Sequence, residues 1–315
     1  MRDDVRAWFD RRLSHAADWP VRALLEAKES QTVAVVLPAL NEEATVGRIV
    51  DRICRDLVVR HLLVDELVVM DSGSTDATAA VAADAGARVV HRDEVLTDLP
   101  AYDGKGEVMW RSLAATGSDV LVFIDSDLRD FSTTFVTGLL GPLLTDRSVQ
   151  FVKATYDRPL QSGESLVTAG GGRVTELVAR PLINMYWPEL AGFIQPLGGE
   201  YAARRTLLEQ LPFPVGYGVE FGLLVDTVRV AGLDAMAQVD LVRRKHRNSS
   251  VTKLGRMAAE IMQVAIDRLE REGRLKSSAP PYTLLTQYER DGSGYRITTT
   301  DVAERERPPI SSLDR

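Results

Sequence analysis

Cysteine is almost absent from this 315-residue sequence, and its scarcity excludes several kinds of site. Because Cys54 is the only cysteine, the chain can form no intrachain disulfide and no metal site built from several cysteines. Histidine is scarce too, with four residues in the whole chain. A bound metal ion would therefore need carboxylate or imidazole ligands.

Long apolar runs and an excess of positive charge are missing as well. No run of about 18 apolar residues occurs, and residues 1–13 are charged throughout and lack the apolar core of a signal peptide. With 38 basic and 45 acidic residues the net charge is −7, which argues against nucleic acid as a general partner, although a local basic patch still suits an anionic substrate. We therefore expect a cytoplasmic protein that binds neither membranes nor nucleic acids.

The composition is otherwise that of an ordinary globular protein, with 45% hydrophobic and 26% charged residues. Apolar runs predict buried strands, and helical patterns lie between them. We expect Asn41 to cap a helix that carries Glu42 and Glu43 in its first turn and ends near Arg55. This alternation predicts a mostly parallel, doubly wound α/β sheet. The expected strands are residues 32–37, 66–70, 87–90 and 120–124.

The remaining segments follow a looser pattern. Residues 5–28 predict one or two amphipathic helices, and residues 151–156 predict a further strand. From about Lys276 the sequence becomes polar and rich in turn-forming residues, so we expect residues 276–315 to form an extended arm or a disordered tail. Further helices are expected at residues 104–115, 173–180, 218–229 and 252–270.

The best-known nucleotide-binding motifs are missing from the strand ends. The first strand is followed by PALNEE (residues 38–43) rather than GxGxxG, and no strand is followed by GxxxxGK[ST], so dehydrogenases and phosphate-loop ATPases lose most of their support. Polar segments instead follow three strands, at residues 38–43, 71–76 and 125–127. Because the carboxyl ends of parallel strands border one crevice, we expect these segments to meet at a ligand site.

The segment Asp125-Ser126-Asp127 carries the most specific chemistry of the three. Two carboxylates one residue apart repel each other unless a cation joins them. A magnesium or manganese ion that bridges to substrate phosphates is such a cation. Taken alone, the motif also fits a strand-end turn that binds nothing.

Longer motifs carry a resemblance to a known family. Four motifs of this chain resemble the donor-nucleotide half of an A-type nucleotide-sugar glycosyltransferase. They are PALNEEATV (38–46), DSGSTD (71–76), GKGEVMWRSL (104–113) and FIDSDL (123–128). With GGGRVTELVARPL (170–182), GEYAARR (199–205), GYGVEFGLLVDT (216–227) and HRN (246–248), the chain is similar to actinobacterial glucosyl-3-phosphoglycerate synthases. The resemblance covers about residues 28–257.

This resemblance implies a fold and an activity. The fold would be an A-type glycosyltransferase domain over residues 1–275, with a nucleotide-sugar-binding half at about 30–150 and a helical acceptor-binding half at about 151–275. The activity would be the metal-dependent transfer of glucose, with retained configuration, from UDP-glucose to the 2-hydroxyl of 3-phosphoglycerate. The resemblance also implies a homodimer.

The resemblance implies contacts to the donor at thirteen positions. Glu42 should accept hydrogen bonds from the ribose, and Lys105 between two glycines suits a cation near the ribose and diphosphate. A surface lysine in a flexible loop is the alternative interpretation of Lys105. The donor residues are Pro38, Ala39, Leu40, Glu42, Ser72, Gly73, Lys105, Asp125, Ser126, Leu197, Tyr217, Glu220 and Arg244.

The resemblance also implies metal ligands and catalytic residues. Asp127 and His246 match the metal ligands and, with Glu220, are the catalytic candidates. Basic neighbours on both sides of His246 should lower its pKa and keep the imidazole neutral for a metal, unless the cluster is simply a solvated charge run. Glu220 could stabilise an oxocarbenium-like state or merely begin a helix. Because no nucleophile stands out, we favour a front-side reaction.

A glycine-rich segment before a helix predicts the acceptor site. Free N–H groups at a helix start and a bidentate arginine suit an anion, although three glycines also suit a hinge. The resemblance places the acceptor's phosphate or carboxylate on Gly172, Arg173, Val174, Thr175 and Asn248.

Two departures from the family pattern keep other functions open. Gly198 stands where the family has serine, and acidic Asp103 precedes the donor-loop glycine. A different donor sugar or a different phosphorylated acceptor is therefore the alternative activity. A non-catalytic nucleotide-sugar sensor is a weaker alternative, because both metal and acceptor groups are present.

Overall fold

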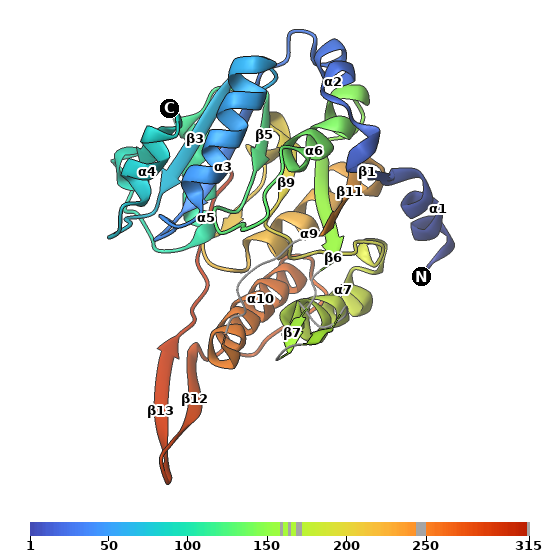
Figure 1. Cartoon of the computed structure of the whole chain (residues 1–315). Helices are drawn as coiled ribbons and strands as arrows, with labels where there is room; N and C mark the ends of the chain where they lie inside the picture. The colour runs from blue at the N-terminus through green and yellow to red at the C-terminus, as the bar shows by residue number, and fades with distance from the viewer. Residues whose placement is uncertain (158–159, 163–164, 168–171, 244–249, 314–315) are drawn as a thin grey trace.

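A computed structural model describes residues 1–157, 160–162, 165–167, 172–243 and 250–313. Its centre is an eight-stranded sheet of order β1-β11-β6-β9-β5-β2-β3-β4, with helices packed on both faces (Figure 1). All neighbouring strands run parallel except β9, which is antiparallel to both β5 and β6. The expected mostly parallel, doubly wound sheet is confirmed. Within the described ranges, no helix is long and apolar enough to cross a membrane.

The inner strands of the sheet are short and buried, as the apolar runs predict, whereas the edge strands β1 and β4 are only partly buried. All five expected strands lie within a residue or two of their predicted bounds, and β1 and β11 extend the sheet at the other edge. The strands are β1 (Leu13–His15), β2 (Val33–Ala39), β3 (Glu66–Asp71), β4 (Arg88–His91), β5 (Val120–Phe123), β6 (Phe151–Asp157), β9 (Tyr201–Arg204) and β11 (Met236–Arg243).

Two apolar cores lie on opposite faces of this sheet, because successive side chains of a strand point to opposite faces. On β2, Val33, Val35 and Leu37 belong to one core, and Ala34 and Val36 belong to the other. The first core is closed by α2 (Val21–Lys28), α3 (Val46–Ile53), α4 (Thr78–Asp84) and α6 (Thr134–Thr145). The second is closed by α1 (Asp3–Arg12), α5 (Lys105–Ala115), α7 (Arg180–Tyr186), α9 (Val219–Ala231) and α10 (Val251–Arg271).

The N-terminal segment contains an element that its amphipathic pattern does not predict. Between α1 and α2 lie the edge strand β1 and a short 3₁₀ turn at Ala16–Asp18. Strand β1 pairs in parallel with β11, with Leu13 opposite Gln238. Three residues are too few for a period of two to be visible in the sequence, so pairing with a distant strand decides their conformation.

The prediction that Asn41 caps a helix is wrong. Helix α3 begins at Val46 with Thr45 at its N-cap, and Asn41 has a left-handed backbone with φ of 57°. Asparagine tolerates this conformation better than most residues, and its side chain is occupied elsewhere: Oδ1 accepts a hydrogen bond of 2.8 Å from the backbone N–H of Thr75. The helix also continues past Ile53 as a π-helical segment, Cys54–Arg60.

Smaller elements connect the helices of the second half. A two-stranded sheet joins β7 (Leu160–Ser162) to β8 (Ser165–Val167), and the helical run before α7 includes a π segment at Thr175–Ala179. The others are the 3₁₀ turns Arg92–Glu94, Pro188–Leu190, Leu233–Ala235 and Ile310–Ser312, helix α8 (Arg205–Leu208) and strand β10 (Phe213–Pro214).

The C-terminal residues leave the body and then return to it. Strands β12 (Leu284–Asp291) and β13 (Gly294–Asp301) form a hairpin that projects away from the sheet (Figure 1). Beyond it, β14 (Glu306–Arg307) pairs with β10, and Val302, Arg307 and Ile310 are buried. An arm is therefore present, but the expectation of a disordered tail is wrong for residues 302–313. The burial of this segment could not be predicted from the sequence, because nothing in the sequence distinguishes a buried arginine such as Arg307 from a solvent-exposed one.

Candidate active site

Two of the polar strand-end segments are locked together by hydrogen bonds. The backbone N–H groups of Asn41 and Glu42 donate to Ser74 Oγ at 3.0 Å and to Thr78 Oγ1 at 2.7 Å. In the other direction, the N–H of Ser72 donates to the carbonyl of Ala39 at 2.9 Å. The segments after β2 and β3 therefore form one rigid edge, as expected for neighbouring parallel strands.

The third segment is tied to the same edge. Ser126 Oγ donates to the carbonyl of Pro38 at 2.7 Å, which fixes the Asp125–Asp127 turn against the end of β2. Gly199 packs directly under the Asp125 carboxylate, where an added Cβ would lie 2.3 Å from both carboxylate oxygens. A side chain at position 199 would thus displace Asp125 from the site.

Lys105 joins two of the predicted acidic residues. Its Nζ lies 2.7 Å from Oδ1 of Asp125 and 2.7 Å from Oε1 of Glu220. The side chains of Lys105, Asp125 and Glu220 are 21%, 20% and 7% exposed, so the ions are largely withdrawn from water. We call these three residues the Lys105 cluster. It combines the start of α5, the end of β5 and the first turn of α9.

The pKa of Lys105 reflects a balance in which the neighbouring charges prevail. Burial by itself lowers the pKa of Lys105, but the charges and hydrogen bonds of Asp125 and Glu220 raise it well above its ordinary value. The ammonium therefore stays protonated at physiological pH. A charged, partly exposed ammonium held by two carboxylates is suited to contact a diphosphate that enters the site.

A second lysine, which sequence analysis missed, lies below the Lys105 cluster. Lys153 on β6 is 1% exposed, donates to the carbonyl of Gly198 and lies 4.9 Å from the ring centroid of Tyr201. Burial lowers the pKa of Lys153 to about 8, although the charges of Glu220 and Glu200 oppose the shift. A lysine in the middle of the apolar run FVKATY was the signal available in the sequence.

The glycines around Lys105 allow a close approach to the loop that carries Tyr217. An added Cβ at Gly106 would lie 1.8 Å from the carbonyl oxygen of Pro214, and one at Gly104 would lie 2.2 Å from that of Val215. The N–H of Gly106 donates to the Val215 carbonyl at 2.8 Å. The flexible-loop interpretation of Lys105 is therefore wrong, because its flanking glycines pack tightly against the segment that precedes α9.

Arg92 organises the segment between β4 and α5. Its guanidinium donates to Ser72 Oγ at 3.3 Å and to the Tyr102 carbonyl at 2.9 Å. It also pairs with Asp103 at 2.7 Å. Asp103, which departs from the family pattern, thus helps to connect the Gly104-Lys105-Gly106 turn to the predicted base-binding residue Ser72.

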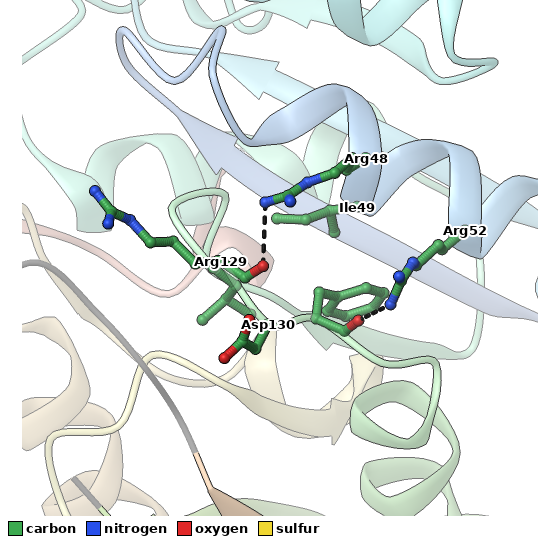
Figure 2. A pocket seen from close by; sticks show the side chains of 7 residues that line it. Arg48, Ile49, Arg52, Arg129 and Asp130 are labelled. Carbon is green, nitrogen blue, oxygen red and sulfur yellow. Dashed lines mark hydrogen bonds between the residues drawn. The ribbon is translucent and has the colours of Figure 1, made fainter. Parts of the chain in front are cut away.

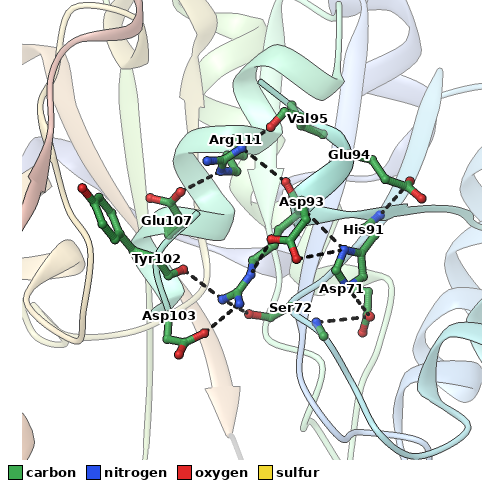
Figure 3. A network of polar contacts seen from close by, with 12 residues as sticks. Asp71, Ser72, His91, Asp93, Glu94, Val95, Tyr102, Asp103, Glu107 and Arg111 are labelled. Atoms are coloured by element: carbon green, nitrogen blue, oxygen red, sulfur yellow. Dashed lines mark hydrogen bonds and ion pairs between the residues drawn. The ribbon is translucent and has the colours of Figure 1, made fainter. Parts of the chain in front are cut away.

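Gly73 and Asp71 complete this part of the edge. Gly73 has φ of 91°, a conformation that favours glycine, and an added Cβ would lie 3.8 Å from Nε2 of His91. Asp71 accepts the N–H of Ser74 at 3.2 Å and lies 3.9 Å from His91 Nε2 (Figure 3). The loop that begins with Ser72 is consequently shaped by side chains that sequence analysis did not select.

The other predicted donor residues lie along the same edge with different exposures. Ala39 is buried, and Leu40 is 53% exposed. Glu42 is half-buried and its Oε2 accepts from Thr45 Oγ1 at 3.2 Å. Leu197 packs partly against the core, and Tyr217 is 38% exposed with Lys253 Nζ 5.8 Å from its ring centroid.

The predicted acceptor residues are partly described. Gly172 has φ of 83°, and the helical run through α7 begins directly after it. Arg173 is half-buried there, whereas Val174 and Thr175 are buried. Arg244, His246 and Asn248 lie outside the described residues. No group of three or more histidine, cysteine or acidic residues that could hold a metal occurs in the described part of the chain.

A cavity of about 340 Å³ lies behind the metal-binding candidate rather than over the Lys105 cluster. It is bordered by Arg48 and Arg52 of α3 and by the segment 128–131 (Figure 2). Arg48 donates to the carbonyl of Arg129 at 3.1 Å, and Arg52 donates to that of Phe131. Arg48 and Arg52 thus hold the backbone of the segment that follows Asp127.

Comparisons with known proteins agree with this geometry. Residues 34–166 match the family model described as "Glycosyl transferase family 2". The glucosyl-3-phosphoglycerate synthase of Mycolicibacterium smegmatis is 48% identical over 97% of this chain and 98% of the relative.

Two solved structures extend the similarity to the whole fold. The glucosyl-3-phosphoglycerate synthase of Mycobacterium tuberculosis, in complex with Mn²⁺, UDP-glucose and phosphoglyceric acid, is 46% identical with a TM-score of 0.82, covering 95% of this chain and 97% of that one. The mannosyl-3-phosphoglycerate synthase of Rubrobacter xylanophilus is 39% identical with a TM-score of 0.90, covering 99% and 98%. An almost full-length match at this identity, together with the site at the sheet edge, means that the chain is a glycosyltransferase that belongs to the glucosyl-3-phosphoglycerate synthase family.

Proposed function

We propose that this protein transfers glucose from UDP-glucose to the 2-hydroxyl of 3-phosphoglycerate, with retained configuration and a divalent metal ion. The observation that carries the proposal is the Lys105 cluster, in which one ammonium joins Asp125 and Glu220 at the carboxyl edge of the sheet. A cation and two carboxylates placed there suit a nucleotide sugar, whose diphosphate needs positive charge and whose hydroxyls need acceptors.

The nucleotide occupies the edge formed by the segments after β2, β3 and β5. Glu42 accepts hydrogen bonds from the ribose, and Ser72 and Gly73 border the base. The interlocked backbone of these segments supports this assignment, because a rigid edge binds a nucleotide without the entropic cost of ordering loops. We assign residues 30–150 to donor binding and residues 151–275 to acceptor binding.

The metal ion is magnesium or manganese, held by Asp127 and His246. The chemistry of Asp127 fits such an ion, because a carboxylate that follows a buried strand, in a turn fixed by Ser126, offers a hard oxygen ligand. When bound, the ion neutralises charge that develops on the departing diphosphate. Lys105 supplies a second positive charge toward the same diphosphate.

Glu220 and Tyr217 contact the transferred sugar. The ion pair with Lys105 orients the Glu220 carboxylate, which is then placed to stabilise an oxocarbenium-like sugar. The same pairing makes Glu220 a poor nucleophile, which supports a front-side reaction. The acceptor hydroxyl then approaches from the side of the leaving diphosphate, and a phosphate oxygen takes its proton.

The acceptor lies at the start of the helical run that includes α7. Arg173 and Thr175, with Gly172, Val174 and Asn248, hold its phosphate or carboxylate. A half-buried arginine beside a glycine of positive φ supports this assignment, because backbone N–H groups and a guanidinium fork are then presented together.

The protein acts in the cytoplasm as a homodimer. A single cysteine is typical of reducing compartments. The projecting β12–β13 hairpin carries large exposed apolar side chains, which supports burial against a second copy. They are Tyr282, Leu284, Tyr288, Tyr295 and Ile297, between 44% and 84% exposed.

Mannose is the second candidate sugar. The similarity to the mannosyl-3-phosphoglycerate synthase structure, with a TM-score of 0.90, favours it specifically. The sugar pocket in this chain includes Tyr217 and Glu220, and discrimination between two hexoses requires the loss or gain of a hydrogen bond to one hydroxyl.

A donor and acceptor matrix tests the proposed function. The purified protein with Mg²⁺ or Mn²⁺ is incubated with UDP-glucose or GDP-mannose and with 3-phosphoglycerate or glycerate, and products are identified by mass spectrometry. We expect glucosyl-3-phosphoglycerate as the main product, and NMR of its anomeric proton should show retained configuration. A mannosyl product would correct the donor, and transfer to glycerate but not to 3-phosphoglycerate would overturn the acceptor.

A further inference from the structure

The loop between β10 and α9, residues 215–218, is held from outside by the C-terminal segment and by α10. The N–H of Val215 donates to the carbonyl of Arg305 at 2.8 Å. The N–H of Gly216 donates to Glu304 Oε1 at 2.9 Å, and that of Tyr217 donates to Glu260 Oε2 at 2.7 Å. Three successive backbone donors of the loop are thus satisfied by residues distant in sequence.

The same loop supports the turn that carries Lys105. The Val215 carbonyl accepts the N–H groups of Gly106 at 2.8 Å and of Glu107 at 3.3 Å. Glu107 is buried and paired with Arg307 of the C-terminal segment at 2.6 Å. A displacement of residues 215–217 would therefore move Lys105 on one side and Glu220 on the other.

Two carboxylates meet at Gly216. An added Cβ there would lie 2.5 Å from Glu260 Oε2 and 2.9 Å from Glu304 Oε2, so both oxygens face the same point. Glu304 Oε2 is buried and has no hydrogen-bond partner among the described residues. Two ionised carboxylates so placed repel each other, whereas protonation of one of them removes this repulsion.

We propose that Glu304 and Glu260 are positioning residues that hold the sugar-contacting loop as a pair that retains one proton, which we call the shared proton. The inference rests on the proposed function, in which Tyr217 and the Lys105 cluster bind the donor. With the proton present the two carboxyl groups do not repel each other, and their hydrogen bonds to the N–H groups of Gly216 and Tyr217 hold residues 215–217. Without it, their repulsion loosens the loop and weakens donor binding.

The charged surroundings allow this proton to be retained near neutral pH. Burial raises the pKa of Glu304 to about 7, and the charge of Glu260 adds to the shift. Burial also raises the pKa of Glu260, against the charge of Arg256. The cations nearby on α10 are engaged elsewhere, since Arg268 and Arg271 lie 2.5 and 2.6 Å from Glu306.

The remaining charged groups around Glu304 are few. Its own segment contributes Arg305 and Glu306. Helix α10 contributes Asp267 and Glu270 to a cavity of about 350 Å³ that both segments line. This cavity reaches Glu304 and gives water access to the proton. Arg305 faces the ring of Tyr102, with 4.7 Å between its guanidinium carbon and the ring centroid.

The sign of the pH effect follows from the raised pKa. Between pH 4.5 and 7 the native protein retains a proton that the unfolded chain releases, so stability falls as pH rises through this interval. The apparent KM for UDP-glucose should rise as the pair loses its proton, by roughly three- to tenfold between pH 6 and 8.

Glu304→Gln separates this proposal from a merely structural role. Glutamine keeps an oxygen to accept the Gly216 N–H and cannot ionise, so the donor KM should stay low and flat from pH 6 to 8. Glu260→Gln should flatten the profile in the same way. Glu304→Ala leaves the Gly216 N–H without its acceptor and should raise the donor KM at every pH, by about fivefold.

Glu26→Gln is the control, because Glu26 is an exposed acid on α2, which packs on the opposite face of the sheet from α10. Its KM for UDP-glucose should rise with pH as steeply as that of the wild type. Melting temperatures at pH 5 and 8 give a second readout that needs no substrate: Glu304→Gln should melt higher than wild type at pH 8 and alike at pH 5.

The outcomes distinguish the two proposals. If Glu304→Gln keeps both the wild-type KM slope and the wild-type fall in melting temperature, the shared proton does not exist and the inference is wrong. If wild type and variants all fail to use UDP-glucose while the melting curves differ as expected, the shared proton stands and the proposed donor fails.

Discussion

Nζ of Lys105 lies 2.7 Å from Oε1 of Glu220, so the first residue of α5 and the first turn of α9 are joined by one ion pair. Asp125, equally 2.7 Å away, adds the end of β5. The pair crosses from the predicted donor half to the predicted acceptor half. One ammonium therefore fixes the relative position of the two halves at the point where the sugar should lie.

Lys105→Met should weaken UDP binding in the presence of Mg²⁺ by about ten- to a hundredfold. Methionine keeps the length of the side chain but removes the charge that would contact the diphosphate, and a hydrogen bond from a charged group contributes about 1.5–3 kcal/mol. Isothermal titration calorimetry measures the change. Lys276→Met, at an exposed lysine, should bind UDP as wild type does. Equal affinities for both variants would remove Lys105 from the donor site.

The donor edge was largely predictable from sequence because it depends on local rules. Apolar runs gave the strands, parallel strands share one ligand edge, and the segments after β2, β3 and β5 indeed interlock there. Lys105 and Asp125, two of the predicted donor residues, lie together as an ion pair. The roles of the predicted residues toward donor, acceptor and metal stay predictions.

What the sequence could not supply were contacts made between distant segments. Asn41 looks like a helix cap, but its amide is used between two loops. Glu304 and Arg307 lie in a polar tail that resembles a disordered one, yet they contact the loop before α9 and the buried Glu107. Tertiary contacts of this kind override local patterns, and no periodicity in the sequence reports them.

Removal of the metal ion should abolish transfer, and His246→Ala should reproduce much of that loss. Chelation with EDTA followed by addition of Mn²⁺ or Mg²⁺ tests the first statement. For His246→Ala we expect a higher metal concentration at half-maximal activity and a weaker dependence of metal affinity on acid pH, because protons compete for an imidazole ligand. Asp127→Asn should also weaken the metal. A His246→Ala enzyme with wild-type metal dependence would contradict the ligand assignment.

Arg307→Met should destabilise the fold by about 3 kcal/mol or more. Glu107 is fully buried between Arg307 at 2.6 Å and Arg111 at 2.6 Å, and removal of Arg307 leaves one cation beside the buried carboxylate and takes away the donor to its Oε2. Urea unfolding measures the loss. Arg296→Met removes an exposed pair with Asp291 on the hairpin, at 3.6 Å, and should change stability by less than about 1 kcal/mol. Similar midpoints for the two variants would contradict a structural role for residues 302–313.

Arg173→Ala should impair the acceptor while it leaves the donor nearly unaffected. If the guanidinium holds the phosphate or carboxylate of 3-phosphoglycerate, its removal raises the acceptor KM and lowers transfer, whereas the Kd for UDP stays within about twofold of wild type. Arg173→Lys should restore little, because an ammonium keeps the charge but lacks the planar fork that binds an oxyanion at two points. Initial rates at varied 3-phosphoglycerate and calorimetry with UDP give the two readouts.

The half-buried Arg180, the first residue of α7, is an unsuitable control because it pairs with Glu176 and donates to the carbonyl of Ile194. Arg22→Ala, at an exposed arginine of α2, is the control and should use the acceptor as the wild type does. Glycerate should be a far weaker acceptor for wild type than 3-phosphoglycerate, and the Arg173→Ala variant should lose most of this preference, because the group that distinguishes the two acceptors is gone. If the variant kept the full preference, the phosphate would be bound by other residues, and Arg173 would belong to the helix rather than to the acceptor site.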